Sequence, residues 1–189
     1  MFTDPILNNL VKKYKAPTFK DRSKFLYEEL VESIIGQQLS GKAADTIFKR
    51  FLELYKGSKF PKPEELLKTD VEKLRGAGMS YSKASYIKNI AQAFKNRDLD
   101  IEMLRKMSDE EIVRELTKIK GVGNWTAEMT LIFTFKREDV FSLGDAGLRR
   151  AIKNLYSIEK EKDILTLAEK WKPKRSYACW YLWRSLEND

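Results

Sequence analysis

The sequence contains no histidine and only one cysteine, Cys179. Without histidine, metal sites built on imidazole and a histidine general base are both excluded. One cysteine cannot form a disulfide framework within one chain, nor a zinc or iron–sulfur site ligated by cysteines. A Ser-His-Asp triad, a zinc hydrolase and a Cys-His pair are therefore excluded, and any acid–base chemistry falls to Asp, Glu, Lys or Tyr.

Long apolar runs are also absent, since none approaches the ~20 residues of a membrane-spanning helix. The first segment, MFTDPILNNLVKKYKAP, lacks the charge followed by a long apolar stretch that marks a signal peptide. At 189 residues with 42% hydrophobic composition, the chain is long enough to bury a core without cross-links. We expect a protein of a reducing, cytoplasmic compartment that has no membrane partner.

The charge balance favours basic residues, with 36 Lys and Arg against 28 Asp and Glu and a formal net charge of +8. Such a balance is typical of proteins that bind a polyanion. A Lys- and Glu-rich surface that only faces solvent, as in thermophile proteins, has a similar composition. Charge alone leaves both interpretations open.

Helical periodicity covers almost the whole chain, and no segment shows the regular alternation of a strand. Residues 25–35 and 41–54 each place apolar side chains on one face of a helix. Ser108 and Glu111 have the spacing of a capping box at the start of another helix. These patterns predict an all-α fold, with residues 1–189 forming a single helical unit.

The segment IKGVGNWTAEM holds Gly121 and Gly123 in a tight turn before a helix. Alternate glycines let backbone N–H groups converge on one point, where the helix dipole is positive, so a phosphate fits there beside Lys120. Alternatively, the glycines only permit a sharp turn between packed helices. The same pattern of helix, Gly-x-Gly and helix recurs at Gly76 and Gly78, which raises the prospect of a second helix–hairpin–helix unit.

Three separated motifs give this turn a context. They are, in chain order, IIGQQLSGKAADTIFKRF, LTKIKGVGNWTAEMTLIFTFKREDVFSLGDAGLRRAI and AEKWKPKRSYACWYLW. Together they resemble the helix–hairpin–helix and Gly/Pro-Asp signature of the base-excision DNA glycosylase superfamily (HhH-GPD), and within it the 3-methyladenine DNA glycosylase II (AlkA-like) branch. The resemblance spans about residues 25–186, nearly the whole chain.

The resemblance implies a two-lobed all-α fold with the helix–hairpin–helix near residues 108–135. One lobe is expected to cover about residues 30–135. The N-terminal segment and about residues 136–189 are expected to form the second. The active site is expected in the cleft between these lobes.

The resemblance implies that the catalytic acid follows the hairpin helix after a loop, and Asp145 in SLGDAGL has that position. Its local sequence alone makes Asp145 the N-cap of the next helix. The two roles are compatible, because a carboxylate at a helix N-terminus stays ionised. A fixed anion then stabilises the positive charge that builds on the sugar when an N-glycosidic bond breaks. Asp139 is the nearest rival, but its charged turn, KRED, predicts a solvated side chain.

Superfamily members that also cut the strand use a lysine amine as nucleophile, two residues after the second hairpin glycine. Trp125 stands at that position. The resemblance therefore implies a monofunctional enzyme that uses water, leaves an abasic site and has no AP lyase activity. It implies no organic cofactor and no iron–sulfur cluster, and a Na+ or K+ ion on the hairpin carbonyls near Ile119 and Val122.

A glycosylase extrudes its target nucleotide into a pocket, and alkylated purines carry positive charge that stacks on aromatic faces. By resemblance, Trp183 provides the stacking surface and Trp125 lines or supports the pocket. Met129 replaces a tyrosine of a well-studied branch, which leaves the base preference open. The other tryptophans, Trp171 and Trp180, are assigned to the helical core.

The loop GQQLSG is where the family carries the wedge that fills the duplex after flipping. Gln38 matches the wedge position, and its apolar neighbour Leu39 is the alternative intercalating residue. The neighbouring Gln37 only caps and packs in this interpretation. The phosphate-binding residues expected at the hairpin and beyond Asp145 are Lys120, Gly121, Gly123, Thr126 and Arg149.

The predicted function is removal of alkylated bases, of the 3-methyladenine or 7-methylguanine type, from double-stranded DNA in base excision repair. The protein is expected to act as a monomer, in the cytoplasm at the nucleoid, or in the nucleus of a eukaryote. Two alternatives remain open: a glycosylase for mismatched or oxidised bases, and a non-catalytic helix–hairpin–helix module that only binds DNA.

Overall fold

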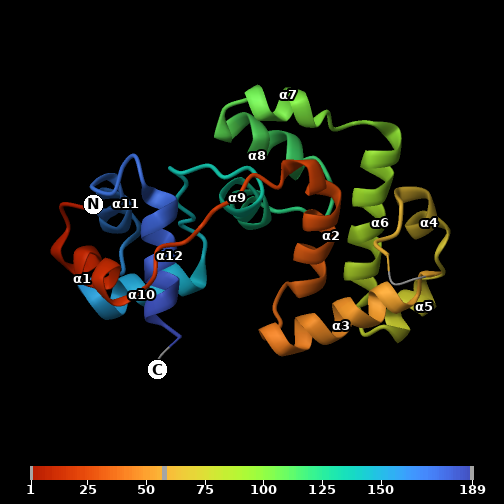
Figure 1. The fold of residues 1–189 in the computed structure, drawn as a ribbon, viewed down its shortest axis with the longest axis horizontal. Helices are drawn as coiled ribbons and strands as arrows, with labels where there is room; N and C mark the ends of the chain where they lie inside the picture. Colours follow the sequence, from red (N-terminus) through yellow and green to blue (C-terminus); the bar gives the residue numbers. More distant parts are fainter. Residues whose placement is uncertain (1, 57–58, 188–189) are drawn as a thin grey trace. The chain divides into compact units, whose positions relative to one another are not determined.

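A computed structural model describes residues 2–56 and 59–187, and every regular element within those ranges is a helix (Figure 1). The all-α prediction is confirmed. None of the helices in the described ranges has the length and apolarity needed to span a bilayer. The elements are α1 (Pro5–Lys13), η1 (Ser23–Phe25), α2 (Leu26–Gly36), α3 (Gly41–Glu53), α4 (Pro63–Lys68), α5 (Val71–Gly76), α6 (Tyr81–Asn96), α7 (Ile101–Lys106), α8 (Asp109–Thr117), α9 (Asn124–Phe133), α10 (Ala146–Tyr156), α11 (Glu161–Glu169) and α12 (Arg175–Ser185).

The chain divides into two compact units, which we describe separately. Unit 1 consists of residues 1–21 and 131–189, and unit 2 consists of residues 22–130. The division falls inside α9, so its first residues belong to unit 2 and its last residues to unit 1.

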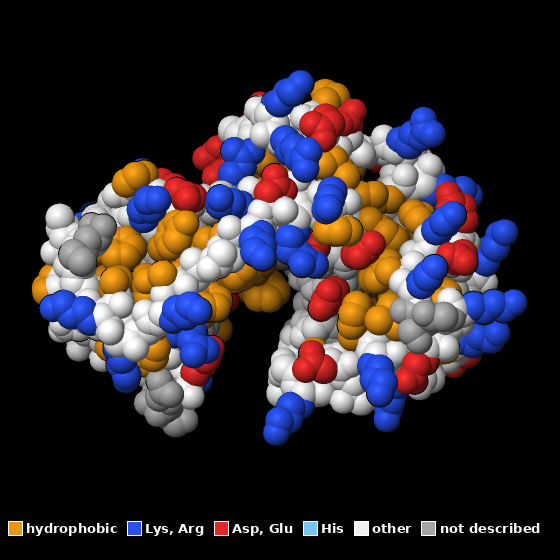
Figure 2. Space-filling view, viewed as in Figure 1, with side chains coloured by type: hydrophobic (Ala, Val, Ile, Leu, Met, Phe, Trp, Pro, Cys, Tyr) orange, Lys and Arg blue, Asp and Glu red, His pale blue; other side chains and the backbone are white. Residues whose placement is uncertain are grey.

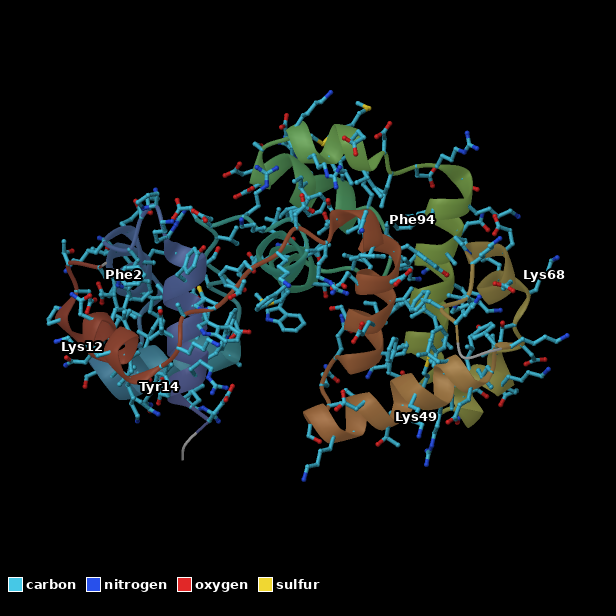
Figure 3. All side chains as sticks on the ribbon, in the orientation of Figure 1. Phe2, Lys12, Tyr14, Lys49, Lys68 and Phe94 are labelled. Carbon is cyan, nitrogen blue, oxygen red and sulfur yellow. The ribbon has the colours of Figure 1, made fainter. Side chains whose placement is uncertain are left out.

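In unit 2, the long helix α6 lies between α2 and α4 (Figure 1). Its residues Ile87 and Ile90 are fully buried, as is Ile34 of α2, because their helical spacing places them on facing sides. Phe94, labelled in Figure 3, extends this contact, with its ring centroid 5.2 Å from that of Tyr27 in α2. The apolar face predicted for residues 25–35 therefore packs against α6, and α3 packs against α2.

The hairpins α5–α6 and α8–α9 of unit 2 each have a glycine at positive φ in the turn, Gly78 and Gly121. The second begins with the predicted capping box: Ser108 Oγ accepts the backbone N–H of Glu111, and the Glu111 carboxylate accepts the N–H of Ser108. The repeated pattern seen in the sequence thus corresponds to a repeated structural element.

In unit 1, α12 packs against α10 and α1 around Trp171, which is fully buried as predicted for a core residue. The Asp4 carboxylate joins these parts. Its Oδ1 accepts the backbone N–H groups of Ile6 and Leu7 at the start of α1. Its Oδ2 accepts the Trp171 indole N–H at 3.1 Å and the Tyr156 hydroxyl at 3.0 Å. Burial, together with the neighbouring Asp4 carboxylate, raises the pKa of Tyr156, so this hydroxyl keeps its proton.

We expect Asp4→Ala to lower the free energy of unfolding by about 3–5 kcal/mol, because it removes a helix cap and leaves the buried Trp171 indole and the half-buried Tyr156 hydroxyl without an acceptor. The control is Asp100→Ala, since Asp100 caps α7 through the N–H groups of Glu102 and Met103 on an exposed surface. That change should cost only about 1 kcal/mol. Urea unfolding measures both, and equal losses would contradict the bridging role of Asp4.

Candidate active site

Asp145 ends the loop that precedes α10 and is only 8% exposed. Its Oδ1 accepts the backbone N–H of Leu148 at 2.7 Å and the indole N–H of Trp183, from α12, at 2.9 Å. The predicted N-cap is therefore confirmed. The indole bond means that the carboxylate is held from two directions, at the positive end of α10.

The approach of the indole to the carboxylate depends on small and aromatic neighbours within unit 1. A Cβ atom at Gly147 would lie 3.1 Å from Asp145 Oδ1 and 3.3 Å from Trp183 Cδ1, so glycine leaves the room that both groups occupy. The ring of Phe133 packs beside the Trp183 indole, with the two ring centroids 5.8 Å apart and an interplanar angle of 31°. These contacts restrict the rotamers of Trp183 and so fix its N–H.

The rival carboxylate, Asp139, is half-buried and paired with an arginine, whereas the sequence predicted a solvated side chain. Arg175 at the start of α12 donates two hydrogen bonds to the carboxylate, from Nε to Asp139 Oδ1 at 2.9 Å and from Nη2 to Oδ2 at 3.0 Å. A second bond from Nη2 reaches the Asp139 carbonyl at 2.8 Å. Such a paired, half-buried carboxylate anchors α12 to the preceding loop. The sequence missed it because the partner lies 36 residues away.

The hairpin between α8 and α9 is held from one side by α6. Gly121 has a φ of +110°, and a Cβ atom there would lie 2.3 Å from Cγ of Tyr86, so both the backbone and the neighbour require glycine. Asn89 Nδ2 donates to the Lys120 carbonyl at 2.9 Å. The second glycine, Gly123, has no atom near a prospective Cβ, and its carbonyl accepts the first helical bond of α9 from Ala127.

Thr126 does not have the surface position expected of a phosphate ligand. It is 1% exposed, and its Oγ1 accepts a hydrogen bond from Nε2 of Gln37 at 3.0 Å. Its hydroxyl therefore faces the loop between α2 and α3 within unit 2. The sequence suggested phosphate binding because Thr126 stands in the first turn of the hairpin helix, but a position on a helix does not reveal which face is covered.

The predicted wedge residues lie on the surface of the α2–α3 loop. Gln38 has a φ of +59° and is exposed, and Leu39 is 37% exposed. A residue other than glycine at positive φ is uncommon, so the backbone at Gln38 has a defined and unusual conformation. The insertion of Gln38, or alternatively of Leu39, into a duplex stays a prediction.

The other predicted residues are placed as follows. Trp125 is 39% exposed, Met129 is half-buried, and Lys120 is exposed on the hairpin. Arg149 forms a 2.8 Å ion pair with Glu161. Their roles in base and phosphate binding stay predictions.

Metal and cofactor binding also stays a matter of prediction. The described residues contain no group of three or more Asp, Glu or Cys side chains arranged to hold a metal ion. On the hairpin, the Ile119 carbonyl already accepts the N–H of Val122 at 2.9 Å, which shapes the turn where a monovalent cation is expected. Burial raises the pKa of the Cys179 thiol, so it remains protonated in the core.

The sequence did not indicate a role for three residues of α6: Lys83, Tyr86 and Asn89. All three contact backbone or glycine positions of the α2–α3 loop or of the hairpin. Their spacing of three residues on one helix face was visible, but nothing in the sequence identified what that face packs against.

On the face that Figure 2 shows, charge does not mark a binding surface by itself. Figure 2 shows Lys and Arg side chains spread over the visible face with acidic side chains among them. Lys118, beside the hairpin, is paired with Glu115 at 2.6 Å. The candidate site is therefore defined by its geometry rather than by a basic patch.

The fold and this geometry agree with a known family. Residues 31–174 match the family model of the HhH-GPD superfamily base excision DNA repair proteins. Because the match covers most of the chain, the protein belongs to that superfamily. The family resemblance found in the sequence is confirmed.

Several relatives carry a more specific name. Over 183 residues the chain is 37% identical to DNA-3-methyladenine glycosylase 1 of Schizosaccharomyces pombe, covering 95% of this chain and 80% of that protein. A structure of the S. pombe 3-methyladenine DNA glycosylase with abasic DNA superimposes with a TM-score of 0.88 at 35% identity, covering 99% of this chain and 95% of the other. A DNA-3-methyladenine glycosidase from Bacillus halodurans gives 0.79 at 36% identity, covering 96% and 84%. These names confirm the predicted branch.

We expect Gly121→Ala to lower the free energy of unfolding by about 3 kcal/mol or more, because the positive φ and the Tyr86 ring both oppose a Cβ atom. Gly123→Ala is the matched control two residues away and should cost at most about 1 kcal/mol. In the double variant Gly121→Ala/Tyr86→Ala, the steric part should be relieved and only the backbone strain should remain. A Gly121→Ala protein as stable as Gly123→Ala in urea unfolding would contradict this packing.

Proposed function

We propose that this chain is a monofunctional DNA glycosylase that removes alkylated bases, of the 3-methyladenine or 7-methylguanine type, from double-stranded DNA. The observation that carries this function is the Asp145 carboxylate, fixed at the start of α10 by the Leu148 N–H and the Trp183 indole N–H. Membership of a base excision repair superfamily, with relatives named DNA-3-methyladenine glycosylase, supports the substrate class.

The chemistry follows from a fixed anion. When the N-glycosidic bond breaks, its electron pair leaves with the base and positive charge builds on the sugar. A carboxylate already oriented by two hydrogen bonds stabilises that charge without reorganising during the reaction. Water then adds its oxygen to C1′ and loses a proton, leaving an abasic site and the free base. A base that is alkylated and cationic is a good leaving group, so no strong general acid is required.

Water is the nucleophile in this proposal because Trp125 occupies the position at which strand-cutting members carry their lysine. An indole cannot form a Schiff base with the sugar, so the strand remains intact after base release. Trp125 is 39% exposed, and in this proposal its ring stacks with the cationic base.

DNA is bound in this proposal through backbone and surface groups. The turn from Gly121 to Gly123 presents N–H groups of the start of α9 to a phosphate, with Lys120 beside it. Gln38 or Leu39 fills the space that the flipped nucleotide leaves. Contacts of this type position the enzyme on DNA of any base sequence, which an enzyme that searches for damaged bases requires. The enzyme then acts where the genome lies, in the cytoplasm or in a nucleus.

The first test is release of bases from a methylated duplex by the native protein and by Asp145→Asn. Asparagine also caps helices well, so the variant should fold normally while losing the negative charge. We expect it to release methylated purines at least about a hundredfold more slowly. With the native protein, strands should stay intact until alkali is added.

Two results would contradict the proposal. Equal release by both proteins would remove Asp145 from the mechanism. No release by the native protein, despite DNA binding that weakens with salt, would redirect the search to mismatched or oxidised bases, and then to a module that only binds DNA.

The indole bond has its own test in Trp183→Phe, which keeps an aromatic ring and removes the N–H that Asp145 accepts. We expect base release to fall about tenfold to a hundredfold, since a hydrogen bond to a charged group is lost. Trp180→Phe on the same helix is the control, because Trp180 Nε1 is buried without a hydrogen-bond partner. A rate equal to that of the control would show that the indole N–H does not position the carboxylate.

A further inference from the structure

The two hairpins of unit 2 repeat the same backbone, in a register that the sequence pattern did not suggest. Gly78 has a φ of +109° and Gly121 a φ of +110°. Two residues later, the carbonyls of Ser80 and Gly123 accept the first bonds of α6 and α9, from Ala84 and Ala127, each at 3.0 Å. Gly78 therefore corresponds to Gly121, the first glycine of its motif, although Gly78 is the second glycine of its own.

In this register, Lys83 and Thr126 are equivalent, each being the third residue of its helix. Both contact the same residue of the α2–α3 loop. Lys83 Nζ donates to the Gln37 carbonyl at 2.7 Å, and Gln37 Nε2 donates to Thr126 Oγ1 at 3.0 Å. Gln37 is thus held at its backbone by one hairpin helix and at its side chain by the other.

The lysine also closes the end of α2. Its Nζ donates to the Ile35 carbonyl at 2.8 Å, in the last turn of a helix that ends at Gly36. An ammonium group is favoured there, because the last carbonyls of a helix lack backbone partners and the dipole is negative. Burial lowers the pKa of Lys83, because desolvation disfavours the charged ammonium.

The same face of α6 supports the α8–α9 hairpin. Tyr86, three residues after Lys83, covers Gly121, and Asn89, three residues further, binds the Lys120 carbonyl. One helix therefore sets both the α2–α3 loop and the hairpin turn, and it does so within unit 2.

We propose that Lys83 and Thr126 are positioning residues that clamp Gln37 and thereby hold Gln38 and Leu39 ready to enter the duplex. The inference rests on the proposed function, because it needs a wedge. Its physical content is preorganisation: a loop that is already ordered loses less conformational entropy when it enters DNA, so flipping and excision are faster.

The test uses Lys83→Met, Lys83→Arg and Thr126→Val, with Lys88→Met as the matched control. Lys88 lies on the same helix and donates to a helix-end carbonyl in the same way, at 3.2 Å to Leu67 of α4. The first measurement needs no DNA. Hydrogen exchange of a peptide covering residues 37–41 should be at least about tenfold faster in Lys83→Met and Thr126→Val, and unchanged in Lys88→Met and Lys83→Arg.

The second measurement is the single-turnover rate of base release from methylated duplex. We expect Lys83→Met to be about tenfold slower than native and Lys83→Arg to recover most of the rate, because a guanidinium also donates to both carbonyls. Affinity for undamaged duplex and its salt dependence should not change in any variant.

Unchanged exchange of the loop would overturn the clamp. Faster exchange with a native excision rate would overturn its role in positioning the wedge. A salt slope reduced by about one in Lys83→Met would make Lys83 a phosphate contact instead. If the native protein releases no base, the proposed function fails, and the exchange experiment still decides whether the clamp exists.

Discussion

The chemistry proposed for this protein depends on one contact, the bond from Trp183 Nε1 to Asp145 Oδ1. A carboxylate at a helix start is common and by itself only a cap. Here the indole of another helix adds a second donor to the same oxygen, so the anion is fixed before any substrate binds. The packing of unit 1 serves this bond, since the pair of Arg175 with Asp139 and the burial of Trp171 both fix α12.

The packing of unit 2 holds short surface turns in a defined conformation. Both of its hairpins need a glycine at positive φ, and both place a residue of the following helix against Gln37. The central helix α6 supplies most of these contacts, to the α2–α3 loop and to the α8–α9 turn. We therefore propose two uses for the repeated hairpin: one copy offers N–H groups to a phosphate, and both copies stabilise the loop that carries the proposed wedge.

Much of the fold could be predicted because its signals are local. Helical periodicity, the capping box at Ser108 and the N-cap at Asp145 each depend on residues within one turn, and all three are confirmed. Contacts between distant segments could not be predicted. Asp139 was expected in solvent because it lies in a charged turn, and the sequence did not reveal its partner Arg175, 36 residues away. Thr126 was expected at a phosphate because of its place in the hairpin helix, and the sequence did not reveal that Gln37, 89 residues away, covers it. The similarity of the hairpins was visible, but its register became clear only from the backbone angles.

The central claim is that Asp145 stabilises positive charge on the sugar, and a charged sugar mimic tests it most directly. Binding would be measured to a duplex with a cationic pyrrolidine in place of the target sugar, and to one with an uncharged tetrahydrofuran. We expect the native protein to prefer the cationic ring by more than about tenfold, and Asp145→Asn to lose that preference. Equal affinities in the native protein, or a preference that survives in Asp145→Asn, would contradict the claim.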